Sequence, residues 1–82
     1  MTYIPPPKFL PAFPDAVRVK PKTPLKGRGF RKRWEDTDFI YEWDSFHGRV
    51  EKYDKRGRHL GEFDHITGEE TKKADPTRSV EP

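Results

Sequence analysis

The chain of 82 residues contains no cysteine, so neither a disulfide framework nor a cysteine-liganded zinc site can hold it together. Apolar residues are scarce, at 30%, and no apolar run approaches the roughly 20 residues that span a bilayer. No signal-peptide pattern opens the sequence. These absences predict a single soluble domain without a membrane-spanning segment, for which any route of export is supplied from outside the chain.

Acidic residues are almost missing from the first part of the chain. Residues 1–34 hold nine Lys/Arg and one acid, Asp15, for a formal charge of +8, whereas residues 35–82 hold eight Lys/Arg and thirteen acids, for −5. A basic arm before a mildly acidic body is typical of proteins that are attracted to polyanions, above all nucleic acid. A solvated basic linker has the same composition, so this feature alone leaves both interpretations open.

Proline shapes residues 1–33, which we predict to be a basic arm that packs partly on the body. Five of the nine prolines fall in residues 1–14. Because proline fixes φ and removes a backbone donor, this stretch should be extended or polyproline-like. Residues 14–19 fit one helical turn or a short strand. Residues 20–34 alternate Lys/Arg with Pro and Gly, which predicts a mobile basic loop.

Residues 34–82 form the predicted folded body. Residues 39–43 are aromatic and β-branched, and residues 49–53 alternate in polarity, as strands do. Further strands are expected at 59–63 and, as a charged edge, at 69–73. No segment keeps a 3.6-residue period. The expected fold class is therefore mainly β, with at most a small α component: an antiparallel sheet of about four short strands.

Three titratable side chains lie within eight residues, in the stretch YEWDSFHGRVEKYD. Strand alternation places Glu51 mid-strand on the face of Arg49 and Tyr53. A bend at residues 45–48 would bring Asp44 and His47 within reach of that face. A carboxylate beside an imidazole orients the ring, and a second carboxylate is then free to accept a proton.

This chemistry is sufficient for RNA cleavage without a metal or cofactor. One group removes the proton from the ribose 2′-OH, a second protonates the 5′-oxygen, and a cation stabilises the charge on the phosphoryl oxygens. On residue types alone, two other interpretations stay open. Small β-proteins carry such side chains in loops for structural reasons, and His47 with two carboxylates is also a partial metal-ligand set, although a second well-placed His or any Cys is missing.

Several separated motifs match one known family in order and spacing. The matching residues are Lys32-Arg33-Trp34, Ile40 through Ser45, His47-Gly48, Glu51, Tyr53, Gly57, His59-Leu60-Gly61, Phe63-Asp64, Thr67-Gly68, and Asp75-Pro76 with Arg78. In this pattern the chain resembles the cytotoxic ribonuclease domain of the colicin E-three type, which bacteriocins and contact-dependent toxins carry. The resemblance covers about residues 20–80.

The resemblance implies a compact, highly twisted antiparallel sheet with a short N-terminal helical piece. It also implies one cut in small-subunit ribosomal RNA at the decoding site, which stops translation. By resemblance, Glu51 is the general base, His47 the general acid, Asp44 the support of His47, and Arg78 the cation that stabilises the phosphoryl charge. The sequence leaves open whether Glu51 or His47 is the base and which of them is the acid. For Arg78 to act, the tail must fold back across the sheet.

The predicted RNA contacts are mostly cations of the arm. The segment before Trp34 should grip the RNA backbone through Arg31, Lys32 and Arg33, with Lys26 and Arg28 of the basic loop beside them. Tyr53, on the face of Glu51, is the candidate for base stacking or hydrogen bonding. The two tryptophans, Trp34 and Trp43, are expected to pack, with stacking on an unpaired base as the alternative.

Other positions near the cluster have less defined roles. His59 and His65 are expected in turn or surface positions, with a place near the site on the neighbouring strand as the alternative for His59. Phe46 is expected to pack, with stacking on a base as the alternative. Phe46 stands where the family more often has Gln, Arg49 replaces an acid, and His65 replaces a proline. None of these departures falls on the four catalytic positions.

The sequence thus predicts an antibacterial toxin domain, secreted or delivered by its producer, that acts in the cytoplasm of the target cell. It needs no cofactor and no metal. The expected partners are the ribosome, a small acidic immunity protein that protects the producer, and larger toxin or delivery domains N-terminal to this segment. The alternative is a non-catalytic RNA- or ribosome-binding module, which the basic arm and the aromatic sheet suit equally well.

Overall fold

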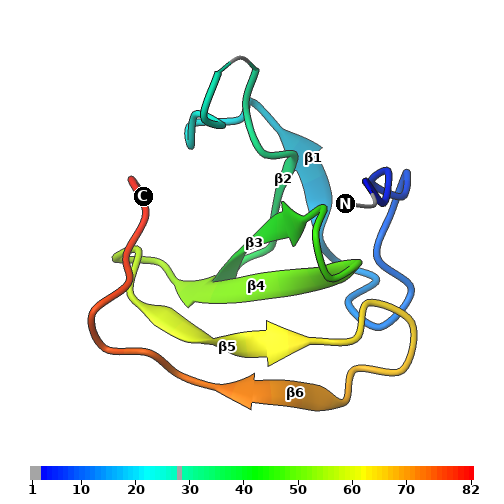
Figure 1. Ribbon diagram of the computed structural model, residues 1–82. Coiled ribbons are helices and arrows are strands. Elements are labelled where there is room, and N and C mark those ends of the chain that lie inside the picture. The colour runs from blue at the N-terminus through cyan, green and yellow to red at the C-terminus, as the bar shows by residue number, and fades with distance from the viewer. Residues whose placement is uncertain (1–2, 28) are drawn as a thin grey trace.

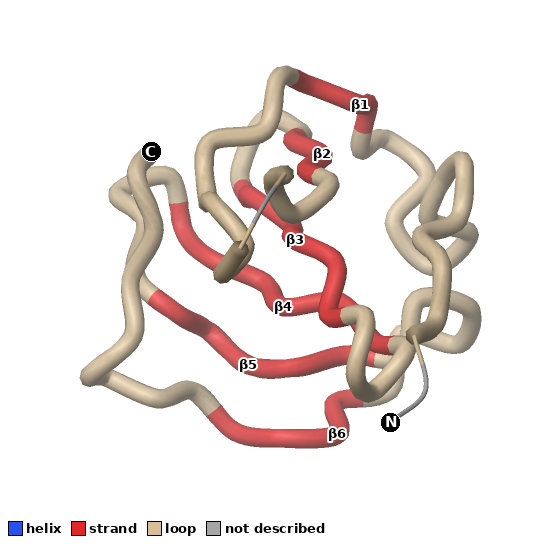
Figure 2. The backbone as a smooth tube through the Cα atoms, turned by 45° about the horizontal axis from the view of Figure 1, so that its top comes forward, coloured by secondary structure: helices blue, strands red, loops and turns tan. Residues whose placement is uncertain are grey.

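The computed structural model describes residues 3–27 and 29–82 and contains one antiparallel sheet of six strands (Figure 1). The order of the strands in the sheet follows the chain, so each strand pairs with the next as in a meander. The strands are β1 (Val17–Val19), β2 (Arg33–Glu35), β3 (Phe39–Asp44), β4 (Arg49–Asp54), β5 (His59–Phe63) and β6 (Glu70–Lys73). Figure 2 shows how strongly the successive strands turn relative to one another.

The mainly β class is confirmed, and β3 to β6 agree with the predicted strands to within a residue. The expected count of about four strands is too low, because β1 and β2 extend the sheet at the N-terminal side. The described part of the chain contains no helix, and so none long and apolar enough to cross a membrane. The short helical piece that the resemblance implied is therefore wrong for residues 3–27 and 29–82.

The arm belongs to the sheet more than its composition suggested. In β1, Val17 pairs with Glu35 of β2, and Trp34 of β2 pairs with Tyr41 of β3. The predicted boundary at residue 33 falls inside β2. Between β1 and β2 the chain doubles back through an isolated bridge from Pro24 to Phe30. For residues 14–19, which fitted one helical turn or a short strand, the structure shows the short strand, at Val17–Val19.

One face of the sheet carries the hydrophobic core, which the proline-rich N-terminal segment covers. The core cluster contains Leu10, Ala16, Trp34, Tyr41, Trp43 and Val50. The indole N–H of Trp43 donates to the carbonyl of Ile4 at 2.8 Å, which fixes the segment to β3. Both tryptophans are buried, so their predicted packing role is confirmed.

The opposite face of the sheet is polar but also largely buried. Three glutamates are direct cross-strand neighbours on it, Glu42 in β3, Glu51 in β4 and Glu62 in β5, and each is at most 3% exposed. Side chains at paired positions of an antiparallel sheet project from the same face. This face therefore holds a row of three carboxylates, and the C-terminal tail runs along one end of it (Figure 1).

Candidate active site

Asp44 and His47 form a hydrogen-bonded pair at the turn between β3 and β4. Asp44 ends β3, and its Oδ1 accepts the backbone N–H groups of Phe46 at 2.9 Å and His47 at 3.3 Å. Its Oδ2 lies 2.7 Å from Nδ1 of His47. An Asp that accepts the amides two and three residues on stabilises a tight turn, so one side chain both shapes the bend and orients the imidazole. The structure brings these two residues together as predicted.

The Asp44 carboxyl is held in its ionised form. Burial alone would raise its pKa, but the hydrogen bonds from the His47 ring and from the Phe46 and His47 amides outweigh burial and lower the pKa below its ordinary value. The His47 ring is about half exposed, at 52% of its side chain. A fixed carboxylate behind an accessible imidazole leaves Nε2 as the ring atom that faces away from Asp44.

Glu51 lies in the middle of β4 and its side chain is only 4% exposed. Its Oε1 lies 2.7 Å from Nε2 of His59 on β5 and 3.3 Å from Nη1 of Arg78 in the tail. The Arg78 Nη2 donates to the Tyr53 hydroxyl at 3.3 Å. Glu51 is therefore a buried carboxylate held by one imidazole and one guanidinium.

The hydrogen bonds around His59 assign its tautomer. The backbone N–H of Asp75 donates to Nδ1 of His59 at 2.9 Å, so Nδ1 is an acceptor without a proton. Nε2 then carries the proton and donates it to Glu51. His59 is 5% exposed, so the turn or surface position expected for it is wrong, and the alternative, a place near the site on the neighbouring strand, is the one observed. The pairing of Tyr53 with His59 across a β-bulge, which single-sequence alternation does not reveal, places His59 beside Glu51.

Arg78 reaches Glu51 because the tail folds back across the sheet, as the prediction required. The Asp75 side chain accepts from the amide and hydroxyl of Thr77, and Arg78 N–H donates to the Asp75 carbonyl, which closes the expected turn. The amide of Val80 then donates to the Gly57 carbonyl at 2.8 Å. Gly57 has φ of 87°, and a Cβ there would clash with the backbone oxygen of Val80, so only glycine admits the tail.

The electrostatics keep Arg78 and Tyr53 in their ordinary charge states. Burial alone would lower the pKa of Arg78, but the opposing effects of Tyr53 and Glu51 are together larger. The pKa of Arg78 is therefore raised above its ordinary value. Burial, together with Glu42 and Glu51, raises the pKa of Tyr53 to about 12 despite the opposing charge of Arg78. Tyr53 is 2% exposed and its ring packs against His59 at 5.3 Å. This placement argues against base stacking and leaves the hydrogen bond to Arg78 as its contact.

The predicted RNA-binding cations have different positions. Lys26 and Lys32 are exposed and Arg31 is half-buried, whereas Arg28 lies outside the described residues. Arg33 is fully buried: it lies 3.0 Å from Glu35 and 3.8 Å from Glu42, and donates to the Glu81 carbonyl at 2.7 Å. A guanidinium in this position has no access to an RNA phosphate. Arg33 lies on β2 directly opposite Glu42 of β3. Its place in a run of basic residues gave no sign of this buried position.

Two further glutamates of the polar face have no role in the sequence prediction. Burial raises the pKa of Glu42, against the hydrogen bond from Thr23 and the nearby charge of Arg33. Glu62 lies on the other side of Glu51, with Oε1 3.6 Å from Nδ1 of His47. Oxygen or nitrogen atoms of Asp44, His47 and Glu62 all lie within 4.8 Å of one another, and among the described residues this is the group with the spacing of metal ligands.

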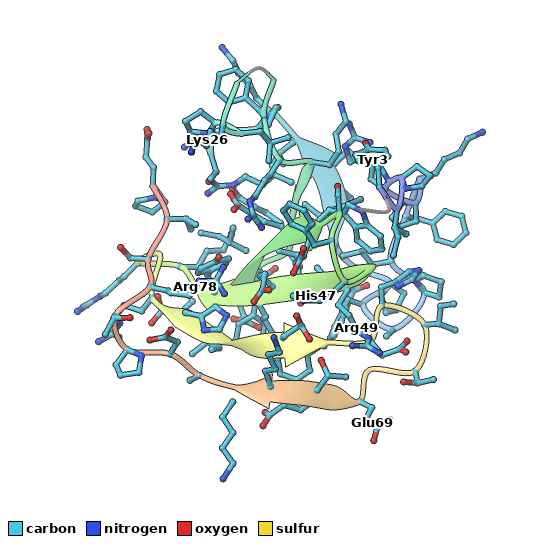
Figure 3. The ribbon with its side chains drawn as sticks, viewed as in Figure 1. Tyr3, Lys26, His47, Arg49, Glu69 and Arg78 are labelled. Atoms are coloured by element: carbon cyan, nitrogen blue, oxygen red, sulfur yellow. The ribbon has the colours of Figure 1, made fainter. Side chains whose placement is uncertain are left out.

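The remaining positions near the site are Phe46, Arg49 and His65. Phe46 is 62% exposed next to His47, so its expected packing role is wrong. The Arg49 Nη1 lies 3.7 Å from Glu62 Oε2. His65 lies in the turn after β5, as expected, and its ring packs edge-on against Trp43 with centroids 5.0 Å apart. Figure 3 shows His47 and Arg49 at one end of β4 and Arg78 at the other.

The family of the chain follows from comparison with known proteins. The profile of the family described as Cytotoxic matches residues 4–81. The chain belongs to this family. Cloacin of Escherichia coli is 42% identical over 84 residues, covering 95% of this chain, and Colicin E3 and Colicin-E6 of the same organism are 50% and 46% identical over 64 and 65 residues, covering 73% and 74%.

The match confirms the colicin E3-type cytotoxic nuclease domain that the motifs indicated, and it extends beyond residues 20–80 to most of the arm. This chain spans between 12% and 15% of the length of those relatives. The cytotoxic domain thus corresponds to a small part of each of them.

Proposed function

We propose that this cytotoxic domain is an endoribonuclease that cleaves small-subunit ribosomal RNA at the decoding site by metal-independent attack of a ribose 2′-OH. The observation that carries the proposal is the placement of Glu51. Its carboxylate is buried, touches the guanidinium of Arg78, and projects from the same sheet face that the Asp44–His47 pair borders. Base, acid and cation thus belong to one surface.

Each residue has a chemical role that follows from its contacts. Glu51 accepts the proton of the 2′-OH, since His59 and Arg78 orient its Oε1 and leave Oε2 for the substrate. His47 gives a proton from Nε2 to the departing 5′-oxygen, while Asp44 holds Nδ1. Arg78, half-exposed beside Glu51, stabilises the charge that develops on the phosphoryl oxygens. The 2′-oxygen bonds to phosphorus as the bond from phosphorus to the 5′-oxygen breaks, one proton moves to Glu51 and another leaves His47. No atom changes its oxidation state, so the reaction needs no redox partner.

The surrounding cations supply attraction for RNA. Lys20, Lys22, Lys26 and Lys32 are exposed on or next to the β1–β2 connection. Such cations bind phosphates and release counterions without reading sequence. The site specificity on the ribosome then depends on shape and on exposed groups near the site, of which Phe46 beside His47 is suited to stack on an unpaired base.

The biological setting of the proposal is interbacterial killing. The domain would be secreted or delivered as part of a longer toxin whose N-terminal regions perform receptor binding and import, and it would act in the cytoplasm of the target cell. The matched stretch makes up only 12% to 15% of each relative, which supports the additional domains. A small acidic immunity protein is the expected inhibitor, because the arm offers it a cationic surface.

The test is to incubate the domain with intact ribosomes, with and without EDTA. The expected product is one short fragment from the 3′ end of the small-subunit RNA, in equal yield under both conditions. Cleavage only with added metal, or no cleavage, contradicts the proposal. His47→Ala separates it from a non-catalytic binding module: the variant should lose cleavage by a factor of about 10²–10⁴ yet still fold and bind ribosomes.

A further inference from the structure

Glu62 has a free oxygen that points at the Asp44–His47 pair. Its side chain is 2% exposed. Its Oε2 accepts the Thr71 hydroxyl at 2.7 Å and lies 3.7 Å from Arg49 Nη1, so this oxygen is engaged. Its Oε1 is buried, has no hydrogen-bond partner among the described residues, and lies 3.6 Å from His47 Nδ1. A buried carboxylate oxygen without a donor is costly to maintain and indicates a missing partner.

The neighbouring groups complete a set of three ligand atoms. Asp44 directs Oδ1 to two backbone amides, which leaves Oδ2 facing His47. Asp44 Oδ2, His47 Nδ1 and Glu62 Oε1 thus converge, and the two carboxylates are held by other contacts, Asp44 by the turn amides and Glu62 by Thr71. Outer hydrogen bonds of this kind are what orient the ligands of a metal site. The Asp44–His47 pair alone would not indicate a bound ligand. The Glu62 oxygen, which is buried without a hydrogen-bond partner and points at this pair, does indicate one.

We propose that Asp44, His47 and Glu62 form a binding site for a divalent transition-metal cation such as Zn²⁺, and that the bound cation inhibits the ribonuclease. The inhibitory part rests on the proposed function. One imidazole nitrogen with two carboxylate oxygens suits Zn²⁺, whereas Mg²⁺ and Ca²⁺ prefer oxygen ligands alone. Water would fill the remaining coordination positions, as it does at zinc sites with three protein ligands.

The three ligand atoms lie within 4.8 Å of one another, and cation binding requires their separations to adjust. Ligand atoms about 2.1 Å from a tetrahedral Zn²⁺ are roughly 3.4 Å apart. The distance from His47 to Glu62, 3.6 Å, already fits, and the 2.7 Å from His47 to Asp44 must widen. His47 lies in a turn and is half exposed, so its ring can move by this amount. The proton that Asp44 and His47 share leaves to solvent as the cation binds.

Inhibition follows from the loss of the acid. With Nδ1 bound to the cation, the ring cannot become an imidazolium, and the N–H that remains at Nε2 is a much weaker acid. The cation also takes Asp44 away from its role of holding the ring. The domain would then bind RNA but fail to protonate the leaving group.

Metal binding is tested by isothermal titration calorimetry of the whole chain with ZnCl₂ in a non-chelating buffer. One cation should bind the unmodified protein. Glu62→Gln should weaken binding at least tenfold, while Glu69→Gln, an exposed carboxylate change away from the site (Figure 3), should not alter it. The absence of a saturable one-to-one isotherm, or equal affinity in Glu62→Gln, overturns the site.

A second measurement on the unmodified protein covers the case in which Glu62→Gln does not fold. Co²⁺ replaces Zn²⁺ as a paramagnetic probe in NMR spectra of the three histidines. The ring signals of His47 should shift or broaden at lower Co²⁺ than those of His59 and His65. Broadening that begins at either of the other two rings contradicts the assignment.

Inhibition is tested in the ribosome cleavage assay. Zn²⁺ should reduce cleavage at least tenfold, and EDTA should restore it, whereas the fractional activity of Glu62→Gln should not respond to Zn²⁺, which controls for effects on the ribosome. Full cleavage at saturating Zn²⁺ overturns the inhibitory part. No cleavage by the metal-free domain overturns the proposed function and the inhibitory part together, and calorimetry then still decides whether the cation site exists.

Discussion

His59 on β5 donates a hydrogen bond from Nε2 to Oε1 of Glu51 on β4, over a distance of 2.7 Å between buried atoms. The opposite ring nitrogen accepts the Asp75 amide, so the tail fixes the ring and the ring fixes the carboxylate. If Glu51 is the general base, as proposed, a carboxylate held in this way needs no reorganisation when the substrate arrives. We infer that His59 positions Glu51 without exchanging a proton itself.

His59→Ala should lower kcat for ribosomal RNA cleavage by up to about 100-fold, with KM little changed, because a misplaced base loses effective molarity and not affinity. His59→Gln, which offers an N–H at a similar reach, should recover part of the loss. His65→Ala is the matched histidine control, since its ring packs on Trp43 away from Glu51. A folded His59→Ala with unchanged kcat contradicts the positioning role.

Arg78→Ala should lower kcat by about 10²–10³, the usual cost of removing one donor to a developing negative charge. Arg78→Lys keeps the charge but loses the two-pronged contact with Glu51 and Tyr53, so its rate should fall between. Arg58→Ala, which breaks an exposed pair with Asp54, serves as the control and should cleave normally. Equal rates for Arg78→Ala and Arg58→Ala would remove Arg78 from the site.

Arg33→Ala should destabilise the fold by about 3–5 kcal/mol, because it leaves Glu42 buried without its ion-pair partner. Urea unfolding measures the change. The neighbouring Lys32→Ala removes an exposed charge and should alter stability by less than about 0.5 kcal/mol while weakening ribosome binding. We therefore expect Arg33 to contribute to stability and the adjacent Lys32 to contribute to ribosome binding. An Arg33→Ala protein that is stable but binds ribosomes weakly contradicts this assignment.

Strand propensity and turn chemistry located β3 to β6 well, because these segments are aromatic or alternating and end in Gly or Asp turns. The same local signals left residues 14–19 open between one helical turn and a short strand, and they missed β2. Val17 and Arg33 lie among prolines and cations. β2 joins the sheet by pairing with β3, and β1 joins it by pairing with β2. Long-range pairing of this kind is invisible to a local pattern.

The contacts of the site also fall into two groups, those that local sequence predicts and those that depend on long-range pairing. Asp44 and His47 are three residues apart, so a turn joins them and spacing predicts their contact. Glu62 and His59 come to Glu51 through the register of β4 with β5, which a bulge shifts between Lys52 and Tyr53. Alternation alone could not give that register. The contact of Arg78 was predicted only through the resemblance, since it depends on a tail that Gly57 admits.

The exposed lysines of the arm should set the salt dependence of ribosome binding. Lys20, Lys26 and Lys32 changed together to Gln should reduce the slope of log K against log salt by about 0.7–0.9 for each phosphate that the variant no longer neutralises. Deleting residues 1–30 is unsuitable for this test, because Leu10 and Ala16 belong to the core. As a control, Lys55, Lys72 and Lys73 changed to Gln carry the same charge loss elsewhere. Equal slopes for the two triple variants rule out the arm as the RNA grip.

Asp36 should contribute stability that depends on pH. Burial alone would raise its pKa, but hydrogen bonds from the Tyr41 hydroxyl and from the Phe39 and Asp38 amides outweigh it and lower the pKa below the ordinary 3.8. A carboxyl with a lowered pKa in the folded state stabilises the fold above its unfolded value, near 3.9, and loses that contribution as the pH falls through the folded value.

Asp36→Asn should therefore reduce the free energy of unfolding by about 1–3 kcal/mol at pH 7, and by progressively less below about pH 4, where the unmodified protein also becomes protonated. Urea titrations at pH 7, 5 and 3 measure both proteins. Asp38→Asn, two residues away and exposed, should show no such pH-dependent gap. A difference between Asp36→Asn and the unmodified protein that stays constant from pH 7 to pH 3 would show that the amide disturbs packing and not the charged hydrogen bonds.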